Sequence, residues 1–272
     1  MHIILKLFFS LPLFFVHTLG CILGLFMYLF DAKFRQRISD NLSKAKLNSL
    51  NKNNKLIISN TMHVGMTLLE SFVIWFASPE KIRSMVKKTI NWNLVNKLTK
   101  KNKGIIFLTP HMGSFEITAQ YFGLESPIKV MFKPNSIKWL NRIIYNGRNK
   151  NYVSPVDISA GGIKQILIAL KKGEAVGILP DQVPPLGHGK WSNFFGQKVY
   201  TMTLIEKLHK LTNSPILFAF GRRKIGHGFE IELFEYTDEV SVVNIDKFIE
   251  KIVRLNPEQY LWNYRRYKLP KS

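Results

Sequence analysis

One stretch near the N-terminus limits the folds open to this chain more than any other feature. Between Leu7 and Phe30 there are 24 consecutive residues without Asp, Glu, Lys or Arg, and a helix needs about 20 predominantly apolar residues to cross a bilayer. The sequence therefore predicts an N-terminal hydrophobic membrane helix. We expect residues 1–35 to form the anchor and residues 36–272 to form one catalytic domain.

Two other interpretations of this stretch are a cleaved signal peptide and a lipoprotein signal ending at Cys21. A signal peptide has a basic start and a small-x-small cleavage site, whereas this chain offers only Lys6 there and continues with GLFMYLF. A lipoprotein signal carries leucine at the third position before its cysteine, whereas this chain has Thr18 there, followed by Leu19-Gly20. A retained anchor is favoured, and the basic segment DAKFRQR after it predicts that the remaining residues lie in the cytoplasm.

The charge of the chain indicates anionic partners. Lys and Arg total 39 against 18 Asp and Glu, a net charge of +21, which suits nucleic acid, phospholipid headgroups, a phosphorylated glycolipid or an acidic carrier protein. With one cysteine, there is neither a disulfide framework nor a cysteine-rich metal cluster. The seven histidines are scattered and form no H-E-x-x-H motif, so no metal site is expected.

The pattern of apolar residues changes at Gly104. Residues 38–100 have the apolar spacing of helices, whereas the later chain alternates short apolar runs, such as GIIFLT, IKVMF, AVGILP and SPILFAF, with helix-like segments. This alternation predicts an α/β fold with a mixed sheet flanked by helices. Ligand sites in such sheets collect where loops leave the carboxyl ends of strands, and His111 and Asp181 each follow a predicted strand.

The segment HMGSFE pairs His111 with Glu116. A carboxylate on one imidazole nitrogen fixes the tautomer and leaves the other nitrogen free to accept a hydroxyl proton. Gly113 permits a tight turn, and Ser114 is expected to cap the following helix. The alternative is a surface histidine beside a capped helix. The spacing alone is weak, because His227 and Glu232 repeat it inside the strand-like run HGFEIELFE.

Two further segments carry unusual combinations of residues. Residues 179–201 read as a long loop that begins after a buried strand with Asp181-Gln182, and its aromatic residues are expected to line an acyl groove or enter lipid; these are Trp191, Phe194 and Phe195. The C-terminal PEQYLWNYRRYK interleaves aromatics with Arg265, Arg266 and Lys268. This pattern suits phosphate recognition at a membrane interface. It would also suit single-stranded nucleic acid, but no nucleic-acid partner is expected because the basic residues coexist with a membrane segment.

Five motifs together resemble the lipid A biosynthesis late acyltransferases, the lauroyl/myristoyl transferase family of Gram-negative bacteria. They are the N-terminal span followed by Asn41-Leu42, HMGSFE, FKPNSIKWLNRIIYNGR, LPDQVPP…FFGQKVYTMT and PEQYLWNYRRYK. They occur in the family's order and cover nearly the whole chain. The resemblance implies a glycerophosphate-acyltransferase-like fold and an H-x-x-x-x-[DE] acyltransferase.

The resemblance also assigns roles to residues. It implies that His111 is the general base and that Glu116 orients it. Lys133, Arg148, Asp181 and Gln182 fall on family blocks expected to bind or position substrate, and the phosphate-binding role of Arg265 and Arg266 suits the same acceptor. At Lys133 many relatives have arginine; lysine keeps the charge but loses bidentate geometry.

The implied reaction moves a fatty acyl group from an acyl-carrier-protein thioester to a hydroxyl of a lipid A precursor, the 3-hydroxyl of an acyl chain already present. No cofactor is expected besides that donor, and direct attack is favoured over a covalent intermediate because Ser114 lacks a G-x-S-x-G elbow. The expected location is the bacterial inner membrane, among its lipids, with the catalytic domain on the cytoplasmic face. A glycerophosphate or lysophospholipid acyltransferase remains the alternative, followed by a non-enzymatic basic membrane protein.

Overall fold

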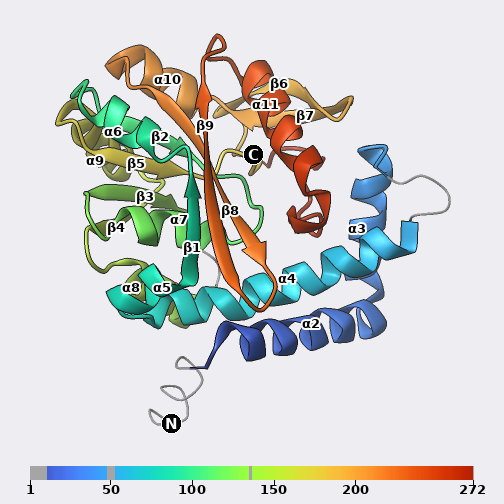
Figure 1. Ribbon diagram of the computed structural model, residues 1–272. Helices are drawn as coiled ribbons and strands as arrows, with labels where there is room; N and C mark the ends of the chain where they lie inside the picture. The colour runs from blue at the N-terminus through green and yellow to red at the C-terminus, as the bar shows by residue number, and fades with distance from the viewer. Residues whose placement is uncertain (1–10, 48–52, 135–136, 272) are drawn as a thin grey trace.

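The computed structural model describes residues 11–47, 53–134 and 137–271. The first part of the charge-free run, residues 7–10, and Asn135-Ser136 of the second family block therefore lie outside the described residues. Within the described ranges the chain forms a mixed seven-stranded sheet in the order β1-β9-β8-β2-β5-β3-β4 and a separate β6-β7 hairpin. Figure 1 shows the sheet with its surrounding helices and with α2 along the lower edge.

The helices are α2 (Leu13–Phe30), α3 (Ala32–Lys44), α4 (Asn53–Phe76), α5 (Pro79–Met85), α6 (Asn93–Thr99), α7 (Phe115–Phe122), α8 (Lys138–Arg148), α9 (Ala160–Lys171), α10 (Leu204–Thr212) and α11 (Val242–Leu255). The strands are β1 (Val86–Ile90), β2 (Ile105–Leu108), β3 (Ile128–Phe132), β4 (Val153–Asp157), β5 (Ala175–Ile178), β6 (Gly189–Phe194), β7 (Gln197–Met202), β8 (Ile216–Lys224) and β9 (Gly228–Tyr236). Neighbouring strands of the large sheet run parallel except for the antiparallel pair β8-β9.

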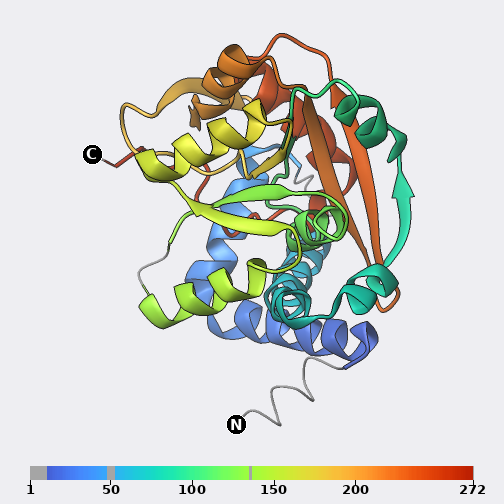
Figure 2. The same cartoon turned by 90° about the vertical axis from the view of Figure 1, so that its left-hand side faces the viewer.

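The central strands are buried on both faces, which explains their uninterrupted apolar sequences. On β2, Ile106 and Leu108 pack into a core shared with α3, α9, α10 and α11, whereas Ile105 and Phe107 pack into a core shared with α4, α5, α6 and α7. Figure 2 shows the helices on both sides of the sheet. The predicted α/β class, with a mixed sheet flanked by helices and an N-terminal apolar helix, is confirmed.

Two strands of the large sheet escaped the sequence analysis because each lies at an edge of that sheet. β1 falls inside the segment expected to be largely helical, and its VKKTI sequence leaves two lysines exposed. β4 contains Pro155, which cannot donate a hydrogen bond to a ladder and is tolerated at an edge. Both strands are specified by the neighbours that they pair with, β9 and β3, rather than by an apolar run of their own.

The expectation of a long aromatic loop at residues 179–201 is wrong in its second half. The β6-β7 hairpin closes through Phe195-Gly196, and both residues have positive φ angles (+50° and +75°) that match a two-residue hairpin turn. Phe194 and Phe195 are buried in the core at 0% and 4% exposure, so neither lines a groove or enters lipid. Only Trp191 of the three aromatics is exposed.

The helix α2 packs against α4 through glycines. A Cβ atom on Gly24 would lie 2.2 Å from the Thr61 carbonyl oxygen, and one on Gly20 would lie 2.5 Å from the Met66 Cα. The Gly20-x-x-x-Gly24 pair is thus a close helix contact, as small residues at this spacing permit. Both α2 and residues 54–76 are long and apolar enough to cross a membrane, but 67% of the latter window is buried inside the protein against 22% for α2. We therefore describe α4 as a core helix.

Candidate active site

The polar residues predicted at strand ends meet at one edge of the sheet. β2 and β5 are parallel neighbours in which Leu108 pairs with Ile178, and the Thr109 N–H continues the ladder to the Ile178 carbonyl. His111 leaves the end of β2 and Asp181 leaves the end of β5. The carboxyl ends of parallel strands share an edge, so the two side chains come together although 70 residues separate them.

Asp181 holds His111 at two points. One carboxylate oxygen, Oδ1, lies 2.7 Å from the imidazole Nδ1, and the other, Oδ2, accepts the backbone N–H of His111 at 2.9 Å. The Asp181 side chain is 2% exposed and that of His111 is 16% exposed. Burial by itself raises the pKa of Asp181, but electrostatic attraction to His111 and the two hydrogen bonds from this residue outweigh burial and hold that pKa below its ordinary value.

This contact fixes the chemistry of the imidazole. Because the ionised carboxylate can only accept, Nδ1–H donates to it and Nε2 carries the lone pair. The amide Nε2 of Gln182 lies 3.1 Å from that imidazole Nε2 and donates to it. Tyr264 lies parallel to the imidazole with the ring centroids 6.5 Å apart, and its hydroxyl accepts the Val183 N–H at 2.9 Å. One nitrogen of the His111 imidazole is therefore fixed by a carboxylate, and the other faces the Gln182 amide.

The expectation that Glu116 orients His111 is wrong in this structure. Glu116 lies in the first turn of α7 and forms a partly buried two-point ion pair with Arg148 at the end of α8. Arg148 Nε donates to Oε2 at 3.0 Å, and Nη2 donates to Oε1. The helix begins at Phe115, so its first turn directs Glu116 toward α8, whereas Asp181 ends the strand beside β2. A catalytic role for Glu116 stays a prediction, now as the partner of Arg148.

The loop between His111 and Glu116 has the predicted tight turn. Gly113 has a φ of +57°, and a Cβ there would lie 2.2 Å from the Gly221 carbonyl oxygen, so glycine is required on both counts. Ser114 occupies the N-cap position of α7, but its side chain makes no capping hydrogen bond and its backbone N–H donates to Gly221 at 2.8 Å. Ser114 therefore occupies the predicted N-cap position, but its side chain does not form the hydrogen bond expected of a cap.

The other predicted binding residues divide into two groups. Lys133 follows β3 at the same edge of the sheet and is exposed, as is Arg265 near the C-terminus. Arg266, by contrast, is buried and pairs with Asp246 at 2.8 Å, and it also donates to the Tyr200 carbonyl and the Thr201 hydroxyl. The expectation that Arg266 binds acceptor phosphate is wrong, because its guanidinium is already enclosed by protein acceptors.

Arg266→Gln is expected to destabilise the protein by about 3–5 kcal/mol, the cost of leaving one partner of a buried ion pair alone. The two side chains are 2% and 0% exposed, so solvent does not compensate the remaining carboxylate. Urea unfolding of the wild type and the variant measures this difference. Arg265→Gln, at the exposed neighbouring position, is the control and should change stability by less than about 0.5 kcal/mol. Equal stability of the Arg266 variant would contradict the structural role.

The C-terminal segment contacts the His111 loop through its backbone, which the sequence analysis did not predict. The Leu261 N–H donates to the His111 carbonyl at 2.9 Å, and Met112 forms a bridge with Tyr260. The sequence signal was present in PEQYLWNYRRYK, but its aromatics suggested a membrane interface rather than a wall around His111. Within the described residues no group of three His, Cys, Asp or Glu side chains is placed to hold a metal ion.

Comparison with known proteins shows the family of the chain. The chain matches the model of the bacterial lipid A biosynthesis acyltransferase family over residues 1–269. It is 27% identical over 276 residues to the lipid A biosynthesis lauroyltransferase of Escherichia coli, covering 95% of this chain and 87% of the relative. It is 26% identical over 228 residues to the lipid A biosynthesis palmitoleoyltransferase of the same bacterium, covering 81% and 74%. A lipid A biosynthesis acyltransferase of Haemophilus influenzae is 26% identical over 231 residues, covering 80% and 72%.

The match spans α2, the His111 loop and the C-terminal segment, so the family predicted from the five motifs is confirmed. The chain belongs to the bacterial lipid A biosynthesis acyltransferase family, and it is an acyltransferase.

Proposed function

We propose that this protein transfers a fatty acyl group from an acyl-carrier-protein thioester to a hydroxyl group of a lipid A precursor. The names of its relatives support the acceptor, and the net charge of +21 favours both an acidic carrier protein and a phosphorylated glycolipid. The observation that carries the proposal is the His111 imidazole, which Asp181 holds at Nδ1 with Nε2 available as a base.

In the proposed reaction, the acceptor hydroxyl takes the place of the Gln182 amide next to Nε2 of His111. Nε2 removes the hydroxyl proton while the oxygen attacks the thioester carbonyl, and Asp181 stabilises the imidazolium that forms. The tetrahedral intermediate collapses by breaking the carbon–sulfur bond, and the imidazolium returns its proton to the thiol of the carrier. The reaction needs no cofactor besides the carrier-bound thioester.

Positive groups around the site have distinct tasks in this proposal. Arg148 pairs with Glu116 in the first turn of α7, and we propose that it stabilises the oxyanion together with the N-terminal end of that helix. Lys133 and Arg265 are exposed and bind the acceptor phosphates.

Acyl transfer with purified protein tests the proposal against its alternatives. Labelled acyl-carrier thioester is offered separately with a lipid A precursor, with glycerol 3-phosphate and with a lysophospholipid. We expect label to move to the lipid A precursor and not to the two glycerol-based acceptors. Transfer to glycerol 3-phosphate or lysophospholipid alone would establish the alternative activity, and transfer from acyl-coenzyme A but not from the carrier would contradict the donor.

We also propose that α2 embeds the protein in the bacterial inner membrane with the site on the cytoplasmic side. The face of α2 opposite α4 consists of exposed apolar side chains, among them Ile22, Phe26 and Phe30 at 58%, 58% and 73% exposure. The basic residues that follow, Lys33, Arg35 and Arg37, suit the anionic headgroups of the cytoplasmic leaflet.

Changing Ile22, Phe26 and Phe30 together to serine is expected to weaken binding to phosphatidylglycerol-containing vesicles by roughly 10²-fold or more, since each buried side chain of this size contributes about 1.5–3 kcal/mol. Vesicle flotation measures the bound fraction. The control is Leu211→Ser on α10, an exposed leucine away from α2 (63% exposed), which should leave binding unchanged. Equal flotation of the triple variant and the wild type would contradict a membrane role for this face.

A further inference from the structure

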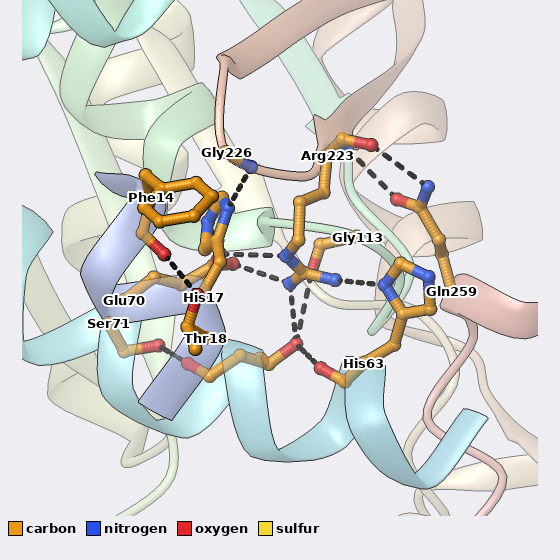
Figure 3. Close-up of polar contacts among 11 residues, drawn as sticks. Phe14, His17, Thr18, His63, Glu70, Ser71, Gly113, Arg223, Gly226 and Gln259 are labelled. Atoms are coloured by element: carbon orange, nitrogen blue, oxygen red, sulfur yellow. Dashed lines mark hydrogen bonds and ion pairs between the residues drawn. The ribbon is translucent and has the colours of Figure 1, made fainter. Parts of the chain in front are cut away.

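Arg223 on β8 has a fully enclosed guanidinium, and Figure 3 shows it at the centre of a polar network. It pairs at two points with Glu70 of α4, since Nε donates to Oε2 at 2.7 Å and Nη2 donates to Oε1 at 2.5 Å. Burial raises the pKa of Glu70, but the charge and hydrogen bonds of Arg223 lower it to about 2. Glu70 is thus ionised, and the two opposite charges balance inside the protein.

The same guanidinium reaches the loop that carries His111. Its Nη2 donates to the Gly113 carbonyl at 3.0 Å and to the Thr67 hydroxyl at 2.7 Å, and its Nη1 donates to Nδ1 of His63 at 2.8 Å. The Gly113 N–H in turn donates to the Gln259 carbonyl at 2.8 Å. Both polar groups of the Gly113 backbone are therefore held, two residues after His111.

The network continues from Glu70 to the N-terminal helix. Nε2 of the buried His17 lies 3.2 Å from Oε2 of Glu70, and Nδ1 of His17 accepts the backbone N–H of Gly226 at 2.9 Å. Because Nδ1 accepts, the ring donates from Nε2 to the carboxylate. Figure 3 shows the resulting chain of contacts from His17 on α2 through Glu70 and Arg223 to Gly113.

We propose that Arg223 is a positioning residue for acyl transfer, which holds the Gly113 carbonyl so that the His111 loop keeps its place, and that Glu70 and His17 extend this hold to α2. The inference rests on the proposed role of His111 as the base. It makes α2 part of the support of the site as well as a membrane-facing helix. A buried ion pair by itself is weak evidence of stabilisation. In this pair, however, Arg223 also donates a hydrogen bond to the backbone of the loop between His111 and Glu116.

Arg223→Lys separates positioning from folding. Lysine keeps a positive charge beside Glu70 but lacks the planar fork that contacts Glu70, His63 and Gly113 together. We expect kcat to fall roughly 10- to 100-fold, as for a misplacement of the reacting groups by about 1 Å, with the KM values for donor and acceptor nearly unchanged. Hydrogen exchange of the substrate-free protein should become faster at the amides of residues 112–115 and remain unchanged in β2 and β5.

Arg222→Lys is the matched control. Arg222 precedes Arg223 on the same strand, points to the other face of the sheet and pairs with Glu230 and Glu232 at partly exposed positions. Its substitution should alter neither kcat nor the exchange of residues 112–115. If Arg223→Lys does not fold, Thr67→Val removes one neutral contact of the same guanidinium and should reduce kcat roughly fivefold to tenfold, as for the loss of one hydrogen bond.

The outcomes distinguish this inference from the proposed function. Normal kcat in a folded Arg223→Lys protein overturns the inference, whether or not the loop exchanges faster. A kcat loss equal to the loss of folded protein, with faster exchange throughout the sheet, overturns it in favour of a purely structural pair. A wild-type protein without acyl transfer would refute the proposed function, and the exchange of residues 112–115, which needs no substrate, would still decide whether Arg223 holds the loop.

Discussion

His111→Ala is expected to lower kcat for acyl transfer by roughly 10²- to 10⁴-fold, the range for losing general-base assistance. The variant lacks the imidazole that is proposed to remove the hydroxyl proton, whereas Oδ2 of Asp181 still accepts the backbone N–H of residue 111. In the proposed function the acceptor is recognised by its phosphates and acyl chains, so KM should change little. Steady-state kinetics with circular dichroism as a check on folding provides the measurement.

The chain contains its own control for this prediction. His227 and Glu232 have the same spacing as His111 and Glu116, but His227 is exposed in the β8-β9 turn and Glu232 pairs with Arg222. His227→Ala should therefore leave kcat near the wild-type value. A folded His111→Ala protein with near-normal transfer, or a folded but inactive His227→Ala protein, would show that another group is the base.

Asp181→Asn is expected to reduce kcat by a comparable factor, roughly 10²- to 10⁴-fold, because an amide in place of this carboxylate favours the wrong imidazole tautomer. Asp181 accepts two N–H groups of His111, one from the backbone and one from Nδ1. Asparagine has only one oxygen, so its NH₂ group would face one of those donors or would donate to Nδ1 and leave the proton on Nε2. Nε2 could then no longer act as a base.

Glu116→Gln is the companion measurement, because it tests the pairing that the HMGSFE spacing suggested. In the structure Glu116 contacts Arg148 and not His111, so its loss should disturb the position of Arg148 and cost the same or less than Asp181→Asn. A severe effect of Glu116→Gln together with a mild effect of Asp181→Asn would mean that Glu116 orients the imidazole during the reaction.

The lowered pKa of Asp181 also gives a pH dependence. Its carboxylate has a lower pKa in the folded protein than its value of about 3.9 in an unfolded chain. The pair with His111 therefore contributes stability that is present above pH 4 and is lost as the pH falls through the folded-state pKa. Asp181→Asn should remove this part of the acid dependence, so unfolding midpoints of the wild type and variant should converge at the lowest pH. A constant difference between them below pH 4 would contradict the assignment.

The sequence by itself determined those helices and strands whose conformation follows from the spacing of apolar residues within one segment. The runs around β2, β3, β5, β8 and β9, and the helical periods of α9 and α10, predicted their own conformations because strands buried on two faces and amphipathic helices have distinct spacings. The placement of His111 and Asp181 after strands followed from the same pattern. The tight turn at Gly113 was also predictable, because glycine readily adopts a left-handed φ, whereas its close approach to Gly221 is seen only in the fold.

Only the tertiary structure decided which polar groups meet. Two carboxylates were candidates to hold His111. Glu116 was favoured because it is close in the sequence, but Asp181 contacts the imidazole because its strand lies beside the strand that precedes His111. Arg265 and Arg266 are chemically identical neighbours, yet one is exposed and the other is enclosed by Asp246 of α11.

Contacts between distant segments also decide the edge strands, the buried phenylalanines and the Arg223 network. β1 and β4 become strands because β9 and β3 offer partners, and Phe194 is buried because the β6-β7 hairpin folds over the core. His17, Glu70 and Arg223 are separated by 53 and 153 residues in the sequence, and no local pattern links them. Local periodicity reports the conformation of one segment, whereas a hydrogen bond or ion pair depends on two segments, and only the packed fold brings those two together.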